Sequence, residues 1–385
     1  MAEPAIEAAA GGFKGAHAEA ADWAGVAKAL MDGLDPVPAG ANLGFLYVTD
    51  ALAADYSSLL TFLRERSGVE HWVGTVGMGI AASGIESFGM PAAVALVGAL
   101  PPGSFRVFGP NNGGLAAATA LRSGWPSGTG PVFGVVHADP RSPRIVELIA
   151  ETAEASGAFL VGGLSSSGGE LPQLADRVVS QVGGAIGLSG VLFDPSLQVA
   201  TGLTQGCAPL GPTRRVTAAE GNLLIEIDER PAVEVLKQDV GELLARDLRR
   251  AAGYVHVGFP IAGSDTGDYL VRNLVAIDPE RGVLGVAERP EVGQPVHFVR
   301  RDPAAACADL ERMARETLTR AGGSARAALY HSCLARGPNL FGPGSVELSI
   351  VRDVLGEIPV AGFFANGEIS HDRLYTYTGV LTLIL

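Results

Sequence analysis

Apolar residues along the chain fall into short runs, and stretches with the apolar spacing of a helix separate these runs. One order of segments, a strand, a helix and a second strand, occurs three times. The predicted segments are 43–49, 50–66 and 69–76 in the first copy, 132–137, 142–156 and 158–161 in the second, and 327–331, 344–355 and 358–363 in the third. A long apolar strand follows each copy, at 92–100, 184–193 and 375–385. The pattern therefore predicts a β-α-β-turn-β unit that is repeated three times.

A glycine-rich turn closes each copy. The turns are 76–86, 161–170 and 360–369, and a glycine leads to a glutamate in each. We expect two of these glutamates, Glu86 and Glu170, to cap backbone donors in their own turns. Glu368 is the candidate for ligand binding, because Asn366 and Gly367 before it are strong turn formers that would fix its direction.

The remaining segments predict a further helix and two antiparallel meanders. The helix covers 16–34; the first meander comprises 197–204, 214–217, 222–227 and a helix at 231–250, and the second 269–277, 283–287, 296–300 and a helix at 303–320. We predict a mixed α+β fold of two domains, with mixed parallel and antiparallel sheets. The predicted ranges are a helical extension at 1–40 and domains at 41–250 and 251–385, with the boundary near Ala251.

Composition narrows the classes of function. The 385 residues are 47% hydrophobic, which suggests about two domains of roughly 100–200 residues each. The formal net charge of −13 would repel phosphate groups, so we expect neither nucleic acid nor an anionic membrane as a partner. The N-terminus lacks the pattern of a secretory signal, and no apolar run reaches the roughly 18 residues that span a bilayer. Three scattered cysteines, Cys207, Cys307 and Cys333, favour a reducing cytoplasm over a disulfide framework.

Motifs for cofactor chemistry are absent or lack their context. Gly77, Gly79 and Ala82 match a dinucleotide-binding pattern, but glycines and a proline interrupt the helix that should follow. The sequence contains no phosphate-binding loop, no H-E-x-x-H pair and no G-x-S-x-G elbow. We therefore expect no cofactor and no metal site.

The segment from His331 to Gly337 ends a predicted strand, where α/β sheets commonly bind ligands. Arg336 would either favour the thiolate of Cys333 or bind a ligand carboxylate with its planar guanidinium. Alternatively, Cys333 is a small buried hydrophobic residue and Arg336 pairs with a surface acid. Cys207 also lies near a strand end, either facing the same cleft or packing independently, and Cys307 is predicted to lie in the core.

Four segments together resemble the FIST family. They are the QGCAPLG run from Gln205, the YLVRNL run from Tyr269, the CLARG run from Cys333, and the AGFFANGEI run from Ala361. The resemblance covers the chain from about Leu43 onward and implies a sensory module that binds small molecules such as amino acids, found in bacterial signalling proteins and some eukaryotic F-box proteins. Because we find neither an F-box-like segment nor room for an output domain, we expect a stand-alone protein that either signals through a separate protein partner or simply binds and buffers its ligand.

These observations lead to one hypothesis and two alternatives. We expect a cytoplasmic binding protein, rather than an enzyme, with a small-molecule pocket at the junction of its halves. The candidate ligand-binding residues are Cys207, Cys333, Arg336, Gly337, Gly362, Asn366, Gly367 and Glu368, with Arg336 and the backbone from Gly362 to Gly367 on a carboxylate and Glu368 on an ammonium group. The alternatives are an enzyme with Cys333 as nucleophile and His331 or His371 as base, and a protein-binding scaffold.

Overall fold

The computed structural model describes residues 12–110, 120, 122–123, 125, 132–180, 187–245, 254–261 and 267–385. The chain divides into two compact units. The sheet unit comprises Met1–Thr204, Asp309–Leu374 and Thr378–Leu385, and the barrel unit comprises Gln205–Ala308 and Tyr375–Tyr377. The boundary expected near Ala251 falls outside the described residues. Each unit mixes helices with strands, so the predicted mixed α+β fold is confirmed.

In the described ranges, the sheet unit contains three six-stranded sheets. The first, in spatial order, is β1 (Phe13–Glu19), β6 (Ala92–Gly98), β2 (Leu43–Thr49), β3 (His71–Gly77), β10 (Gln173–Asp176) and β11 (Val178–Val179). The second is β7 (Phe105–Phe108), β12 (Leu188–Phe193), β8 (Val132–Ala138), β9 (Ala158–Leu164), β24 (Glu368–His371) and β25 (Arg373–Tyr375). The third is β13 (Val199–Gln205), β26 (Thr378–Ile384), β22 (Ala327–Cys333), β23 (Val360–Ala365), β4 (Gly79–Ala82) and β5 (Ile85–Phe88).

The three sheets share one plan, which confirms the predicted repeat and extends it. In each sheet a parallel pair of strands is followed by a hairpin from another repeat. The hairpin β4–β5 of the first repeat joins the third sheet, β24–β25 of the third joins the second, and β10–β11 of the second joins the first. This cyclic exchange ties the three repeats into one unit.

Each repeat also begins with an edge strand, and the sequence pattern revealed only the third of these, which it predicted at 197–204 as part of a meander. These strands are β1, β7 and β13. The helix predicted at 16–34 was wrong in its first turn, because 16–19 belongs to β1 and the helix α1 is Trp23–Leu34. Alanine and glycine there would permit a helix, but β1 pairs with β6 along its whole length, and these tertiary hydrogen bonds override local propensity. In the third repeat the barrel unit is inserted after β13.

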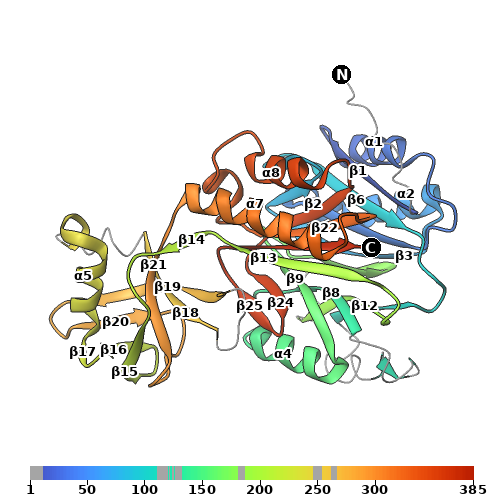
Figure 1. Cartoon of the computed structure of the whole chain (residues 1–385). Coiled ribbons are helices and arrows are strands. Elements are labelled where there is room, and N and C mark those ends of the chain that lie inside the picture. Colours follow the sequence, from blue (N-terminus) through green and yellow to red (C-terminus); the bar gives the residue numbers. More distant parts are fainter. Residues whose placement is uncertain are drawn as a thin grey trace. The chain divides into compact units, whose positions relative to one another are not determined.

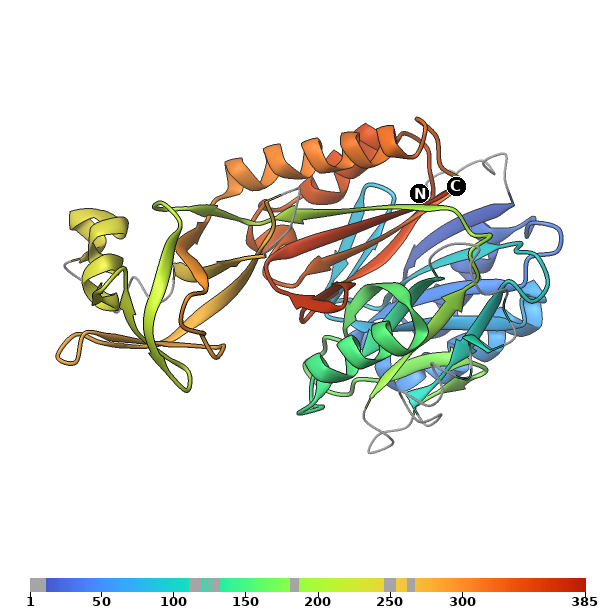
Figure 2. The ribbon, with the colours of Figure 1, turned by 60° about the horizontal axis from the view of Figure 1, so that its bottom comes forward.

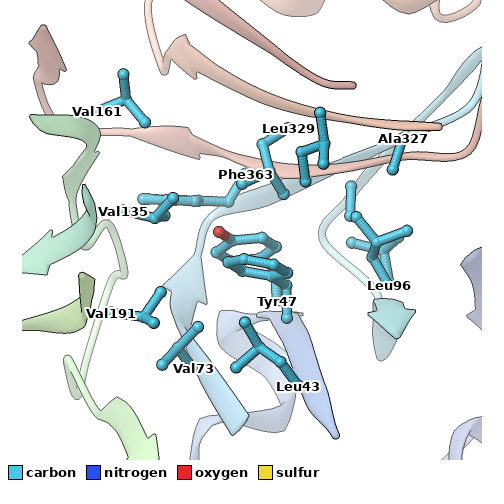
Figure 3. Close-up of a cluster of buried hydrophobic side chains, with 14 of the residues drawn as sticks. Leu43, Tyr47, Val73, Leu96, Val135, Val161, Val191, Ala327, Leu329 and Phe363 are labelled. Atoms are coloured by element: carbon cyan, nitrogen blue, oxygen red, sulfur yellow. The ribbon is translucent and has the colours of Figure 1, made fainter. Parts of the chain in front are cut away.

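Helices cover the outer faces of the sheets, while the inner faces share one core (Figures 1 and 2). The helices are α1 and α2 (Tyr56–Ser67, after a 3₁₀ turn at Asp50–Asp55) on the first sheet, α4 (Ile145–Ser156) on the second, and α7 (Pro303–Arg320) and α8 (Val346–Leu355) on the third. In the shared core the rings of Tyr47 and Phe363 stack with their centroids 5.2 Å apart, and Val135 and Val161 approach from the second sheet (Figure 3).

A glycine stands at the same register position in each parallel pair. Gly74, Gly162 and Gly362 lie opposite Leu46, Val136 and Tyr330. A Cβ atom on any of these glycines would lie within 2 Å of the facing carbonyl oxygen, at 1.7, 1.9 and 1.7 Å. Close approach of two backbones therefore explains the glycines.

The barrel unit is a closed ring of antiparallel strands with a helix packed against them. Its elements are β14 (Cys207–Pro209), β15 (Arg214–Glu220), β16 (Leu223–Ile227), β17 (Arg230–Pro231), α5 (Ala232–Ala245), β18 (Val255–Pro260), β19 (Tyr269–Asp278), β20 (Val283–Val286) and β21 (Pro295–Arg301). Pairing of β21 with both β15 and β18 closes the ring. The meander strands predicted at 214–217, 222–227, 269–277, 283–287 and 296–300 therefore lie in one sheet, whereas the strand predicted at 197–204 is β13 of the third sheet in the sheet unit.

Candidate functional site

A buried cluster of polar side chains lies where β22 ends. Arg336 follows this strand, and Glu347 projects from the first turn of α8; neither side chain is exposed. Glu347 Oε1 accepts hydrogen bonds from Tyr330 Oη (2.7 Å), Ser332 Oγ (2.8 Å) and Arg336 Nε (2.7 Å), and its Oε2 accepts one from Gly337 N (2.8 Å). Burial lowers the pKa of Arg336, but the charge of Glu347 and the interactions with Tyr330 together outweigh burial and raise that pKa.

The outer end of the Arg336 guanidinium is not used by this network. Its Nη1 and Nη2 atoms are buried and have no hydrogen-bond partner among the described residues. The ring of Phe341 lies over the group, 5.0 Å from Cζ to the ring centroid, which is a cation–π distance. Buried donors of this kind are costly unless something binds them.

Glu368 is the second incompletely bonded group in this region. It begins β24 and is fully buried. Its Oε2 accepts hydrogen bonds from Thr378 Oγ1 (2.8 Å) and Thr378 N (3.2 Å), whereas Oε1 has no partner among the described residues. Burial raises the pKa of Glu368 to about 8, and contacts with Thr378, Arg336 and Cys333 partly oppose this rise. Burial therefore favours the protonated form of this carboxyl in the folded protein.

The corresponding position in the other repeats carries no free acid. Glu368 pairs with Gly163, Gln173 with Thr75, and Ile80 with Phe363, which makes Gln173 and Ile80 its structural equivalents. The amide of Gln173 donates to Gly187 O (3.2 Å) and accepts from Ser189 Oγ (2.7 Å), so both of its polar atoms are bonded. The unused oxygen is thus particular to the third repeat.

The prediction that Glu86 caps backbone donors in its own turn was wrong. Glu86 lies in β5, and because that hairpin is exchanged, its Oε1 accepts from Leu348 N (3.2 Å) at the start of α8 and not from its own turn. Burial and the nearby charge of Glu347 raise the pKa of Glu86 to about 7. Glu170 is exposed in the loop after β9.

The structure brings together only part of the predicted ligand-binding set. Cys333, Arg336, Gly337 and Glu368 belong to the sheet unit, and Cys333 and Arg336 both lie near enough to Glu368 to lower its pKa. Cys207 belongs to the barrel unit, where it packs against Tyr269, Val271 and Val299. Cys307, expected in the core, is half-buried in α7.

The predicted anion-binding backbone is engaged in sheet pairing. Gly362 lies inside β23, between β22 and β4. Asn366 is exposed, its N–H donates to Leu164 O (3.0 Å), and the oxygen of Gly367 accepts from Leu164 N (2.9 Å). This turn therefore fixes the direction of Glu368 by bonding to β9, and the groups named here are not available as an anion nest.

His331, the alternative catalytic base, faces the shared core. Its Nε2 lies 3.2 Å from Tyr47 Oη, and His137 Nε2 lies 3.1 Å from the same oxygen. The three residues occupy the same register position in the three repeats, opposite Phe363, Thr75 and Gly163. Burial lowers the pKa of His331 to about 3 and holds that of His137 well below its usual range. His371 is exposed beside Asp372, 3.1 Å away.

Several residues of the cluster escaped sequence reasoning, chiefly Glu347, Ser332 and Thr378. A signal existed for Glu347, because it shares the apolar face of α8 with Leu348, Val351 and Leu355. A carboxylate on such a face requires a buried partner.

A separate pocket of about 570 Å³ opens at the N-terminal end of β3, where His71 lies. It is lined by Asn42, Glu70, His71, Pro102, Gly103, Phe105, Arg106, Val107 and Asp176. His71 Nδ1 lies 2.6 Å from Asp176 Oδ1. Among the residues that the structure describes, no three His, Cys, Asp or Glu side chains are arranged to hold a metal ion.

No helix in the described ranges has the length and apolar character needed to cross a membrane.

Two domain models of one protein family together match almost the whole described chain. The FIST N domain matches residues 42–230, and the FIST C domain matches residues 232–371. The chain belongs to the FIST family. FIST domains are described as sensory domains that bind small ligands in signalling proteins.

Relatives of this FIST protein occur in mycobacteria. An uncharacterized protein of Mycobacterium tuberculosis strain H37Rv is 35% identical over 243 residues, which is 60% of this chain and 61% of the relative. An uncharacterized protein of Mycobacterium bovis is 32% identical over 241 residues, again 60% and 61% of the two chains. The FIST chain therefore spans about three fifths of the length of these curated relatives.

Proposed function

We propose that the protein is a cytoplasmic sensor that binds a small molecule with a carboxylate and an amine, such as an amino acid, through Arg336 and Glu368. One observation carries this proposal: Arg336 Nη1, Arg336 Nη2 and Glu368 Oε1 are buried and have no partner among the described residues. Native proteins pair nearly all buried polar atoms, so unused donors and an unused acceptor in one region favour a polar ligand.

The ligand class follows from the two charges. Glu347 holds Arg336 through Nε, which leaves the two Nη atoms to face a carboxylate as a planar fork. Glu368 Oε1 would accept a hydrogen bond from the ammonium group. An adjacent positive charge lowers the pKa of a carboxyl, so ligand binding would release the proton of Glu368.

Entry of the ligand requires movement of the loop between β22 and α8. Both key side chains are fully buried, and Phe341 covers the guanidinium. Gly342 and Gly344 in this loop have φ values of 86° and 94°, and a Cβ atom would meet nothing within 4 Å of either. Small residues with free space can absorb the backbone rotation that opening requires.

We expect the protein to pass the ligand-binding signal to a separate partner protein, because a sensory domain acts through another protein or domain. The family assignment supports the sensory role, and the absence of a disulfide among the described cysteines supports a reducing compartment.

Calorimetry with a panel of amino acids tests the proposal, using the Glu368→Gln variant. Glutamine stands at the equivalent position of the second repeat, so the fold should accept it. We expect at least about tenfold weaker binding, since a charged hydrogen bond is worth about 1.5–3 kcal/mol. The matched control is Thr382→Val, which changes a buried hydroxyl without a partner in the neighbouring β26. Equal affinity of the two variants, or no binding by the wild type, would refute the proposal.

A further inference from the structure

The C-terminal part of the chain leaves the sheet unit for three residues. Tyr375–Tyr377, here called the strap, belongs to the barrel unit although the strand β26 that follows belongs to the sheet unit. Thr376 Oγ1 donates to Val271 O (2.7 Å), and Tyr377 Oη donates to Asn273 Oδ1 (2.8 Å). The strap is therefore bonded to two residues of β19, Val271 and Asn273.

Ring packing adds a second attachment within the barrel unit. The Tyr377 ring lies 4.5 Å from that of His256 on β18, and it packs against the apolar cluster that contains Cys207. His256 is buried, and its side chain lies beside Asn273, whose Oδ1 accepts the hydrogen bond of Tyr377. Tyr377 therefore contacts residues of both β18 and β19.

The next residue after the strap is the hydrogen-bond donor of the candidate site. Thr378 binds Glu368 Oε2 through both its hydroxyl and its backbone N–H. Tyr377 itself has a φ of 64°, a conformation that costs a non-glycine residue free energy and persists only where its surroundings hold it. Glu368 and β19 are therefore linked through two adjacent, tightly held residues.

We propose that the strap transmits the state of Glu368 to the barrel unit, and thereby couples ligand binding to the stability of β18 and β19. The ligand-driven part of this inference rests on the proposed function. When an ammonium group faces Oε1, Glu368 is ionised, and a carboxylate accepts the two hydrogen bonds of Thr378 more strongly than a neutral acid does. A firmly held Thr378 keeps the strap on β19, whereas a weakly held one allows it to leave.

Hydrogen exchange of the full-length protein, followed by mass spectrometry, tests the link without a ligand. Thr378→Val removes one hydrogen bond to Glu368, and Glu368→Ala removes the acceptor of both Thr378 hydrogen bonds. Both variants should exchange the amides of 269–278 about threefold to tenfold faster than the wild type, as expected for the loss of one hydrogen bond. Thr378→Ser keeps the hydroxyl and should restore the wild-type rate.

The control is Thr382→Val, in the same strand but outside the link. It should leave exchange at 269–278 unchanged. Rates for Thr378→Val and Glu368→Ala that equal the control would overturn the inference. Acceleration spread evenly over all peptides would also overturn it, because global destabilisation would then explain the effect.

Exchange measured with a bound amino acid distinguishes a failure of this inference from a failure of the proposed function. An amino acid that binds in calorimetry should slow exchange at 269–278 in the wild type and not in Thr378→Val. Absence of any bound amino acid, with the variant effects intact, would refute the proposed function and leave the mechanical link standing. Binding without any change at 269–278 would refute the link alone.

Discussion

Two buried acids near the end of β22 differ in how completely their oxygens are used. Glu347 accepts four hydrogen bonds and neutralises Arg336, whereas Glu368 keeps one oxygen without a partner in the described structure. Glu347 is thus best understood as the residue that positions Arg336. Glu368 retains the capacity to bind something else.

Loss of the Glu347 charge should destabilise the protein strongly. Glu347→Gln leaves the Arg336 charge buried without compensation, and breaking a buried pair typically costs about 3–5 kcal/mol. Urea unfolding measures this loss. Glu316→Gln is the control, because it breaks the half-exposed pair with Arg312 and should change the free energy of unfolding by about 0.5 kcal/mol or less. Similar midpoints for the two variants would show that Glu347 is not the organising residue.

At the scale of elements, the exchanged hairpins and the close strand pairs hold the three sheets together. Each hairpin pairs with a strand from another repeat, so no repeat can complete its sheet alone. The glycines of the parallel pairs are the points at which the backbones lie closest. These positions should tolerate change least.

Gly362→Ala should disrupt the third sheet. The added Cβ would lie 1.7 Å from Tyr330 O, and backbone cannot yield as a flexible side chain can. We expect a loss of more than about 3 kcal/mol, within the range of severe overpacking. Gly169→Ala, in an exposed loop with nothing within 4 Å of the new atom, is the control. Thermal unfolding compares them, and a melting temperature for Gly362→Ala equal to that of the control would contradict the assigned packing role.

For the whole molecule, buried ionisable groups in both units set opposing pH dependences. Burial lowers the pKa of His137, His256, His297 and His331, to about 4 for His256 and about 3 for His331. The unfolded chain therefore binds protons more readily at these sites, and stability falls as the pH drops below about 6.5. Burial raises the pKa of Glu86 to about 7 and of Glu368 to about 8, so stability falls as the pH rises from about 4.5 toward those values.

The two effects predict a stability maximum between about pH 6 and pH 7, where the proton numbers of the folded and unfolded states balance. Chemical unfolding at pH 4 to 9 measures the curve. Glu368→Gln should flatten its alkaline side, and His331→Phe should flatten its acid side. A curve that keeps rising from pH 6 to pH 9 would show that the buried acids do not stay protonated in the folded protein.

Much of the local structure could be predicted because it depends on local spacing. Apolar periodicity placed the helices and the paired strands of the three repeats within a few residues, for example β2 at Leu43–Thr49. It also placed α7, the helix after the second meander, at Pro303–Arg320. The strand end that carries Cys333 and Arg336 was found in the same way, because a polar motif after an apolar run marks the end of a strand.

The sequence by itself determined the repeated units, the mixed fold and the choice of Arg336 and Glu368 as candidate ligand-binding residues, because these depend on residue order and local chemistry. Only the tertiary structure decided which partners these residues have. Exchange of hairpins moved Glu86 to α8 and made Gln173 the counterpart of Glu368. Likewise, Glu347 became the partner of Arg336 and Thr378 that of Glu368 through folding, since contacts between segments distant in sequence follow from strand pairing and not from spacing along the chain.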